Sequence, residues 1–318
     1  MRRLVAVLGA VLMVVVAVLV RGVLDGDDAG SADGGDEGRS DGEVSLLCAD
    51  ELEAVCRALR DDGEIADYAL EAAGDTVDRM TVDGEDLGAD GWLTVDPFPE
   101  LTEVGRGVAN LGRLFGEPAA TGRTTGLAVA VDPDRTVALI NACDDEVTWP
   151  CLGELAGDRW STHGGEAAWG PVTVGVEGPD SATGLLTTTQ AAAAHLDLPD
   201  FATNDLQSGE VFRWLGRFEP GLDVAGTMVL RPGSFSAVAT LEVEAERLAG
   251  TAQGEGLGIF YPAPMYRAEV VVVAPRADAD GLIGDEALDE ALDEAGWGTE
   301  RGEPLPGAGA VYALRERL

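Results

Sequence analysis

Residues 169–196 read WGPVTVGVEGPDSATGLLTTTQAAAAHL, and they predict a strand, a tight turn and a helix in direct succession. The apolar run 172–176 is the expected strand, residues 178–180 (GPD) are the turn, and residues 181–184 (SATG) begin a helix rich in Leu and Ala. Ser, Thr and Asp cap helix N-termini because their side-chain oxygens accept hydrogen bonds from free amides. Where a strand ends and a helix begins, such amides point into any cleft at the strand end, so this stretch predicts a ligand-binding geometry.

The rest of the chain repeats the alternation of strand and helix. Expected strands alternate with expected helices in the first third of the chain: strands at 44–48, 64–70 and 92–96, helices at 50–60, 74–80 and 100–111. This order implies a parallel sheet that is covered on both faces. In the second of these helices, Asp75 or Thr76 is the expected cap.

A second lobe is expected to follow the first. The strands 127–131 and 136–140 lead into it, and it contains helices at 152–156 and 209–218 and a strand at 235–241. The β-branched strand 266–274 returns to the first lobe, and helices at 285–295 and 311–317 complete the chain. A chain that leaves one lobe, builds a second and returns crosses twice between them, and two such lobes are able to close over a ligand by a hinge motion.

The N-terminal residues 1–24 have the pattern of an export segment. Arginines precede an uncharged apolar run, 4–20, as in a signal peptide or a signal anchor, so contact with a membrane is expected through this segment. Small residues at 29–32 lie well beyond the run, which favours an uncleaved anchor, although a cleaved signal stays open. Residues 25–43 are mainly Asp, Gly, Ser and Glu and predict a disordered acidic linker. We therefore expect a single-pass membrane protein with an extracytoplasmic domain, or a secreted protein.

The charge of the chain excludes several classes of partner. The formal net charge is −37, with 58 acidic and 21 basic residues. Nucleic acid and anionic lipid head groups would be repelled by such an acidic surface. A solvated acidic surface is the simplest explanation of the composition.

The four cysteines predict two disulfide bonds. An even number of cysteines in an exported chain suggests such bonds, with three possible connectivities. The pairs close in sequence, Cys143–Cys151 and Cys48–Cys56, are the simplest. The second pair requires Cys48 to precede the helix, since eight residues within one helix would hold the two cysteines about 12 Å apart. No CxxC motif is present, so we expect no zinc, and no other metal or cofactor is expected.

The sequence resembles the bacterial extracellular solute-binding proteins of the type II periplasmic-binding fold, which are the substrate-binding domains of ABC-type transporters. The resemblance is carried in order by LLCADELEAVC, AAGDTVDRM, DGWLTVDPFPEL, WPCLGELAG, the stretch 169–186 and YPAPMYRAEVVVVAP. It implies an α/β, two-lobed fold with a cleft between the lobes, preceded here by a transmembrane or signal helix. The solute-binding-like domain would span 44–318, with lobe one at 44–140 and 262–318 and lobe two at 141–261.

The resemblance also implies a set of residues that face the ligand. These residues stand at helix starts and at the hinge: Ala49, Asp50, Thr76, Trp92, Thr94 and Asp96 on lobe one, and Ser181, Ala182, Thr183, Thr240 and Tyr261 on lobe two. For Ser181, Thr183 and Thr76 the alternative role is a helix cap, and for Trp92 it is the core. Asp50 and Glu51 stand where oxyanion-binding relatives carry hydroxyl donors, and their charge would repel an anion. A cationic or a neutral polar solute is therefore as plausible as an anionic one.

The sequence is compatible with three functions. The first is the capture of a small polar solute between two lobes, with an ABC-type permease or another membrane protein as partner. The second is an accessory envelope sensor or scaffold of the same fold without a small ligand. The third, an extracytoplasmic hydrolase, has little support because the turn GPDSATG is not the nucleophile elbow G-x-S-x-G. We expect a binding protein and not an enzyme.

Overall fold

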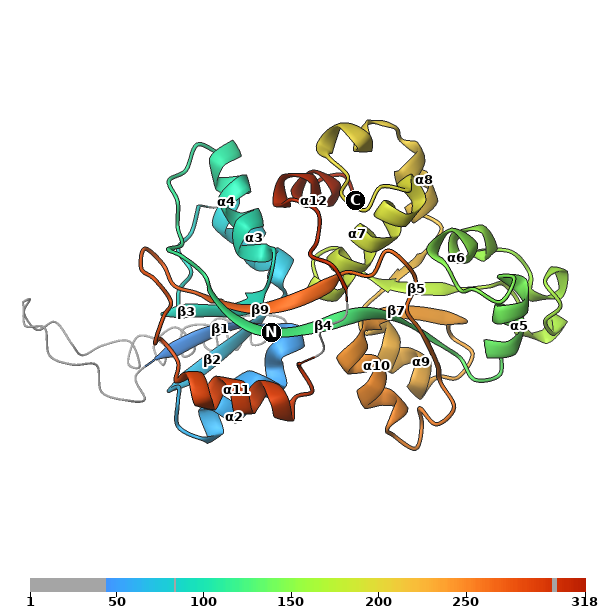
Figure 1. Cartoon of the computed structure of the whole chain (residues 1–318), viewed down its shortest axis with the longest axis horizontal. Coiled ribbons are helices and arrows are strands. Elements are labelled where there is room, and N and C mark those ends of the chain that lie inside the picture. The colour runs from blue at the N-terminus through green and yellow to red at the C-terminus, as the bar shows by residue number, and fades with distance from the viewer. Residues whose placement is uncertain (1–43, 83, 299–301) are drawn as a thin grey trace, which may run out of the picture. The chain divides into compact units, whose positions relative to one another are not determined.

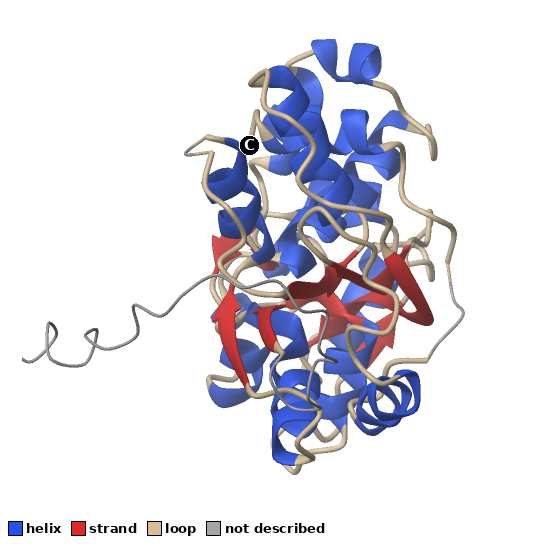
Figure 2. Ribbon diagram, turned by 90° about the vertical axis from the view of Figure 1, so that its left-hand side faces the viewer, coloured by secondary structure: helices blue, strands red, loops and turns tan. Residues whose placement is uncertain are grey.

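A computed structural model of the chain describes residues 44–82, 84–298 and 302–318, which all belong to one compact unit, 41–318. Its strands form a layer with helices on both faces (Figures 1 and 2). The strand order is β2-β1-β3-β9-β4-β7-β5-β6, and β8 pairs with β4 beside this path. The mixed α/β architecture with a sheet covered on both faces is the one that the alternation of strands and helices predicted.

The first half of the sheet contains the early strands, and we refer to it with its helices as lobe one. The parallel strands are β1 (Ser45–Ala49), β2 (Asp67–Glu71) and β3 (Gly91–Val95), followed by antiparallel β9 (Arg267–Val273). Helices α2 (Glu53–Asp61) and α11 (Asp285–Glu294) pack together on one face. Helices α3 (Ala73–Thr81), α4 (Phe98–Val108) and α12 (Ala308–Arg315) lie on the other (Figure 1).

The second half of the sheet, with its helices, is lobe two. It contains β5 (Val174–Glu177), β6 (Glu219–Gly221), β7 (Ala237–Leu241) and β8 (Gly258–Phe260). Helices α9 (Val224–Leu230) and α10 (Glu242–Ala249) cover one face, and α7 (Ala182–Leu196) covers the other. The remaining helices, α5 (Thr136–Ala142), α6 (Trp149–Leu155) and α8 (Glu210–Leu215), lie with this half in Figure 1. Short 3-10 helices occur at Asp50–Leu52 (η1), Trp160–Thr162 (η2), Ala167–Trp169 (η3) and Thr203–Gln207 (η4).

The long strand β4 (Ala119–Val131) joins the two lobes. It pairs with β9 from Ala119 to Gly126 and with β7 from Leu127 onward. The change of partner therefore comes earlier than the predicted lobe boundary after residue 140. The return crossing runs through β8, which pairs with β4, and then β9. The chain thus crosses twice, as predicted, and strand pairing is continuous through β4 from one lobe to the other.

Residues 136–140 form part of helix α5 and not the predicted strand. The turn before them explains the difference. The carbonyl of Asp132 accepts hydrogen bonds from the amides of both Arg135 and Thr136, which begins helical geometry at that point. The buried side chain of Arg135 also donates to Asp132 and to the carbonyl of Phe235, so a long-range contact fixes this local structure. Tertiary contacts of this kind override local propensity.

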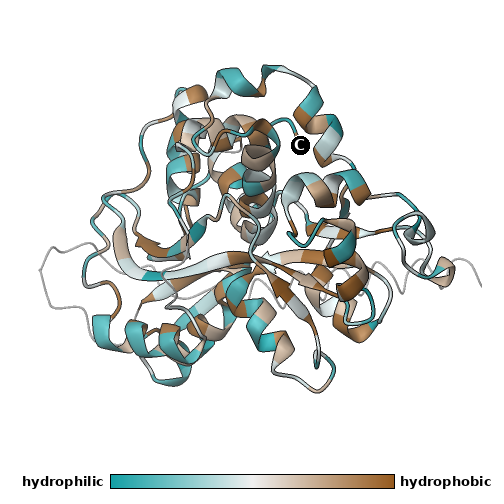
Figure 3. Ribbon diagram, turned by 45° about the vertical axis from the view of Figure 1, so that its right-hand side comes forward, coloured by the Kyte–Doolittle hydropathy of each residue, from teal (hydrophilic) through white to brown (hydrophobic). Residues whose placement is uncertain are grey.

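Apolar side chains hold the layers together. Figure 3 shows the apolar segments gathered along the strands, whereas the helices at the lower left are mostly hydrophilic. One buried cluster extends through both lobes and includes Trp92, Trp149 and Trp160, and a smaller one lies between β4, β7, α9 and α10. Helix α7 is buried from Ala182 to Ala193. Many of its residues are small (Ala, Thr and Gly), so neighbouring elements can approach it closely.

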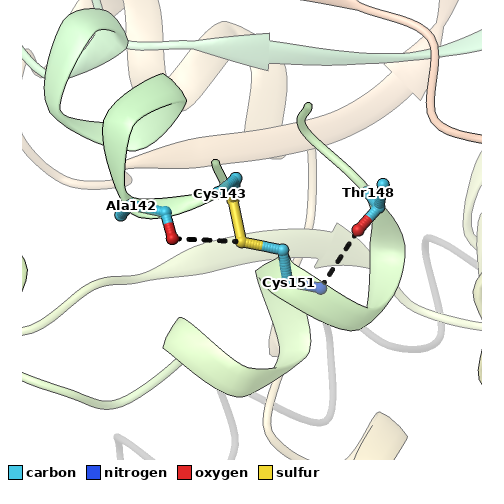
Figure 4. Close-up of a disulfide and its surroundings, with 4 residues drawn as sticks. All are labelled: Ala142, Cys143, Thr148 and Cys151. Carbon is cyan, nitrogen blue, oxygen red and sulfur yellow. Dashed lines mark hydrogen bonds between the residues drawn. A yellow bond between two sulfur atoms is a disulfide. The ribbon is translucent and has the colours of Figure 1, made fainter. Parts of the chain in front are cut away.

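Both disulfide bonds are those of the close cysteine pairs. Cys48 lies in β1 and Cys56 in α2, so the chain folds back between them, with their Cα atoms 6.7 Å apart. Cys143 follows α5 and bonds to Cys151 in α6, with their Cα atoms 5.7 Å apart (Figure 4). The amide of Cys151 donates to Thr148 Oγ1, the N-cap of α6, so this disulfide is attached to a capped helix end.

The predicted export segment 1–24 and the predicted linker 25–43 lie outside the described residues. Within the part of the chain that the structure describes, no helix combines the length and the apolar character that a membrane span requires.

Candidate functional site

The N-terminus of α7 is built by the turn that the sequence indicated. Ser181 is the N-cap: its Oγ accepts a hydrogen bond from the amide of Gly184 at 2.8 Å and donates to the carbonyl of Gly178 at 3.2 Å. A Cβ on Gly184 would lie 2.0 Å from that same carbonyl oxygen, so only glycine fits there. The Ser181 hydroxyl thus both donates and accepts within the turn and caps α7.

Thr183 contacts lobe one. Its amide donates to Oε1 of Glu51 at 2.9 Å, and its hydroxyl lies 3.4 Å from the same oxygen. Glu51 belongs to η1, directly after β1, so a carboxylate at the end of a lobe-one strand caps a lobe-two helix. Helix N-termini favour anions because their free amides and the helix dipole both attract negative charge. Glu51 therefore occupies the anion-binding position of α7.

The N-terminus of α3 meets the same turn. The amide of Gly74 donates to the carbonyl of Asp180 at 2.8 Å, and a Cβ on Gly74 would lie only 2.6 Å from Asp180 Cα. The N-terminal tips of α3 and α7 are thus in direct contact, and this contact is made by Gly74 and not by Thr76.

Neither predicted cap of α3 acts as one. The N-cap position is Ala72, which makes no side-chain cap bond. Thr76 lies one turn inside the helix, fully buried, and its hydroxyl donates to Glu71 Oε2 at 2.6 Å. Glu71 also accepts two hydrogen bonds from Arg79. Burial opposes the ionisation of Glu71, but these hydrogen bonds outweigh it and lower the pKa of that carboxyl.

Arg315 of α12 links the two tips. Its guanidinium donates to both carboxylate oxygens of Asp78, to the carbonyl of Gly74 and to Asp180 Oδ1, at 2.7 to 3.1 Å. Helix α12 itself packs on α4 of lobe one and on η4 of lobe two. We use the term interlobe junction for the five residues that make these contacts: Glu51, Gly74, Asp180, Thr183 and Arg315.

The other predicted ligand residues are distributed over three places. Ala49 and Asp50 stand next to Glu51, and Ala182 stands beside Thr183, so the structure brings these near the interlobe junction. Trp92, Thr94 and Thr240 are buried within strands, and Trp92 packs on Phe115 with ring centroids 6.0 Å apart, so Trp92 belongs to the core. Asp96 is exposed at the end of β3, and Tyr261 packs beside the smaller apolar cluster.

Negative charge accumulates around the interlobe junction. Burial raises the pKa of Glu51, although its bonds to Thr183 act in the other direction. Burial, together with Glu51, Asp223 and Glu244, raises the pKa of Glu177 to about 7. Partial desolvation and neighbouring carboxylates also raise the pKa values of Asp50 and Asp75. Carboxyls whose pKa values are raised in this way resist ionisation, and a cation placed among them would relieve that cost.

No metal centre is evident in the described residues: no group of three or more His, Cys, Asp or Glu is arranged to hold an ion. The two histidines have other contacts. His163 lies 3.1 Å from Asp158, and His195 stacks on Trp214 with centroids 4.5 Å apart.

Solved structures share the fold of this chain. The iron-bound HitA of Pseudomonas aeruginosa matches with a TM-score of 0.55 at 13% identity, over 86% of this chain and 99% of that one. The chain has the type II periplasmic-binding fold. The periplasmic binding protein AfuA of Actinobacillus pleuropneumoniae, with bound fructose-6-phosphate, matches with a TM-score of 0.51 at 14% identity, over 87% of this chain and 95% of that one.

A periplasmic thiamin-binding protein matches the same type II fold with a TM-score of 0.51 at 12% identity, over 84% of this chain and 85% of that one. No model of a protein family matches the sequence, and no curated protein matches it. At these identities the likeness establishes the fold.

Sequence reasoning missed four of the five residues of the interlobe junction as contacts. Glu51 and Thr183 are 132 residues apart, and Arg315 and Asp180 are 135 apart, so no local pattern connects them. The one available signal was the acidic pair at 50–51 in a position where a hydroxyl donor was expected.

Proposed function

We propose that this chain is an extracytoplasmic solute-binding protein, membrane-tethered or secreted, that captures a small polar solute between its two lobes. The type II fold supports this, as do the two crossings through β4 and β8–β9. Two of the solved structures of that fold named above are of periplasmic binding proteins, and the third is of an iron-bound protein. An ABC-type permease or another membrane protein is the proposed partner, reached through the segment 1–24.

The solute is proposed to be neutral or cationic. The single observation that carries this is the hydrogen bond from the Thr183 amide to Glu51, because it fills the helix position where an anionic solute would otherwise bind. An oxyanion would have to displace Glu51 and then stand among Asp50, Asp75 and Glu177, which repel it. A cation gains from the same carboxylates.

Capture would follow a shift between open and closed populations. The closed form is held by the Glu51–Thr183 and Gly74–Asp180 hydrogen bonds and by Arg315. A solute favours closure only to the extent that it binds the closed form more tightly than the open one. A solute that supplies a cation to Glu51 and Glu177 meets this condition, because those carboxylates come together only when the lobes close.

Thermal-shift and calorimetric titration of the full-length chain tests the proposal. We expect a neutral or cationic solute from a panel of amines, amino acids, thiamin and sugars to raise the melting temperature, and sulfate, phosphate and molybdate to leave it unchanged. The Glu51→Ala variant should gain affinity for oxyanions, because the α7 amides become free. Glu210→Gln, an exposed carboxylate on α8, is the control and should behave as the wild type. Preferential binding of oxyanions by the wild type would contradict the proposed class.

A second candidate is the accessory sensor or scaffold without a small ligand. The close approach of Gly74 to Asp180 favours it, since the helix tips touch where a solute would be held. A melting temperature that no solute in the panel changes at millimolar concentration would support this candidate over solute capture. The hydrolase hypothesis gains no support: among the described residues, neither histidine hydrogen-bonds to a serine.

The proposed tether has its own test. Deleting residues 1–24 should release the chain from the membrane fraction of an expressing cell, with export then supplied by a cleavable signal. If the shortened chain still sediments with membranes, the domain itself binds the membrane, and the tether proposal is wrong.

A further inference from the structure

A cavity of about 550 Å³ lies within lobe one, away from the interlobe junction. The end of β3, helix α4, the segment that leads into β4, and β9 form its walls. Its apolar lining includes Phe115, Val104 and Val271, and its acidic lining comprises Asp96, Glu100 and Glu103. Cavities of a few hundred Å³ with apolar walls and a few convergent polar groups are typical small-molecule sites.

The cavity floor is held in place by the sheet. The amide of Asp96 donates to the carbonyl of Glu269 at 2.8 Å, which fixes the end of β3 against β9. Thr94 lies opposite Val271 in the same register, so the face that carries Val271 also carries Asp96, two residues further along. Phe115 packs on buried Trp92, which holds the aromatic wall in place. A site built on packed strands and a buried aromatic ring is preorganised for a ligand.

The acidic groups of the cavity are poorly compensated. Glu103 accepts hydrogen bonds through Oε1 from the amides of Leu114 and Phe115, but its Oε2 is buried and has no hydrogen-bond partner. Arg113 also lines the cavity and forms an ion pair with Glu103: its Nε is 3.7 Å from that oxygen, and its side chain is 77% exposed. Desolvation, Glu100 and Glu269 raise the pKa of Asp96 to about 6. A cationic group placed here would meet Asp96 and Glu100, for which the described residues offer no ion pair, beside Glu103, whose ion-pair partner Arg113 is exposed.

We propose that this lobe-one cavity binds a small organic cation, an amine that carries an aliphatic or aromatic body. The ammonium group would lie near Asp96, Glu100 and Glu103, and the body would pack against Phe115, Val104 and Val271. An inorganic divalent ion would leave the apolar walls unused. This site is separate from the interlobe junction, because all of its lining residues come from lobe one.

The test is calorimetric titration of the full-length chain with phenethylamine and with its neutral isostere 2-phenylethanol. Near neutral pH and at low salt, we expect the amine to bind about tenfold more tightly than the alcohol. Asp96→Asn and Glu100→Gln should each weaken amine binding by about fivefold, whereas Asp62→Asn, an exposed carboxylate at the end of α2, should leave it unchanged. Lowering the pH to about 5 should weaken amine binding by about fivefold, because Asp96 then takes up a proton.

Three results would overturn the proposal. They are equal affinity for amine and alcohol, no binding of the amine at about 10 mM, and full affinity in both Asp96→Asn and Glu100→Gln; a fourth concerns Glu51. A loss of amine binding in Glu51→Gln would place the amine at the interlobe junction instead, which would leave the proposed solute capture standing and remove the lobe-one site. Unchanged melting temperatures of the variants show that a loss of binding is not a loss of folding.

Discussion

The carboxylate of Glu51 accepts a hydrogen bond from the amide of Thr183 at 2.9 Å, so lobe one supplies the anion that caps the longest helix described in lobe two. The two residues are far apart in sequence and no covalent bond links them, so the contact exists only while the lobes are together. It therefore reports on closure.

We expect Glu51→Ala to speed the hydrogen exchange of the Thr183 amide by about tenfold or more, because a hydrogen bond to a charged acceptor contributes about 1.5–3 kcal/mol. The amide of Gly74, bonded across the same junction, should follow. Measurement is by hydrogen exchange of the full-length chain, read by NMR or by peptide mass. Glu246→Ala, an exposed glutamate on α10, is the control and should change neither amide. Equal exchange in all three proteins would mean that Glu51 does not hold the lobes together.

Gly74 and Gly107 are both helical glycines, and they differ in what surrounds them. A Cβ at Gly74 would lie 2.6 Å from Asp180 Cα, whereas a Cβ at Gly107 would have nothing within 4 Å. Gly74→Ala should therefore cost about 1–3 kcal/mol of unfolding free energy through overpacking, and Gly107→Ala should gain up to about 1 kcal/mol from helix propensity. Urea denaturation measures both. Two variants of equal stability would show that the tips separate without cost.

The carboxyl of Glu177 makes stability depend on pH. Its pKa rises from 4.5 to about 7 in the folded chain, mainly through burial and through Glu51. A folded-state pKa above the unfolded one means that the folded state binds more protons between these values. The contribution of Glu177 is therefore fully present below pH 4.5 and is lost as the pH rises through about 7.

Glu177→Gln removes that dependence. Relative to the wild type, the variant should be more stable at about pH 8 than at about pH 5, by about 2 kcal/mol. Urea denaturation of both proteins at the two pH values provides the comparison, with Glu210→Gln as the exposed control. A difference between variant and wild type that does not change with pH would contradict the shifted pKa.

The two disulfides close loops of equal length, since each pair is 8 residues apart in sequence. Loop-closure entropy alone then predicts the same loss, about 2.5 kcal/mol, for each double alanine variant. Cys48 and Cys56 are fully buried, however, whereas Cys143 is 7% exposed and Cys151 is half-buried. Replacing Cys48 and Cys56 should also leave a cavity and so cost more. Denaturation of Cys48→Ala/Cys56→Ala and Cys143→Ala/Cys151→Ala tests this order, and a smaller loss in the first pair would reverse it.

The local helices and strands could be predicted where the hydrophobic pattern of the sequence agrees with the burial in the structure. The strand, turn and helix within 169–196 form as expected, because Ser181 caps the helix in a glycine-bounded turn. The sequence pattern gave wrong predictions where contacts with residues distant in sequence determine the local structure. Residues 136–140 carry strand-forming side chains but are helical, and Thr76 bonds to Glu71 instead of capping α3.

The candidate site was only partly predictable for the same reason. Thr183 and Ser181 could be placed at a helix start from the sequence, but their partners could not. Glu51 and Arg315 reach the turn from elements more than 130 residues away, and that pairing depends on how the lobes fold together. Asp96 was predicted as the last residue of a strand and directly follows β3 in the structure, but the cavity that it lines is formed with α4 and β9, which no local pattern relates.

The position of β9 has a consequence for synthesis of the chain. It pairs with both β3 and β4, although every strand of lobe two precedes it in sequence. While the ribosome is still making lobe two, β3 and β4 each lack β9 as a neighbour. The edge of the apolar strand β3 is then unpaired. Unpaired strand edges promote aggregation. The nascent chain should therefore depend on chaperone protection until the valines of β9 have emerged from the ribosome.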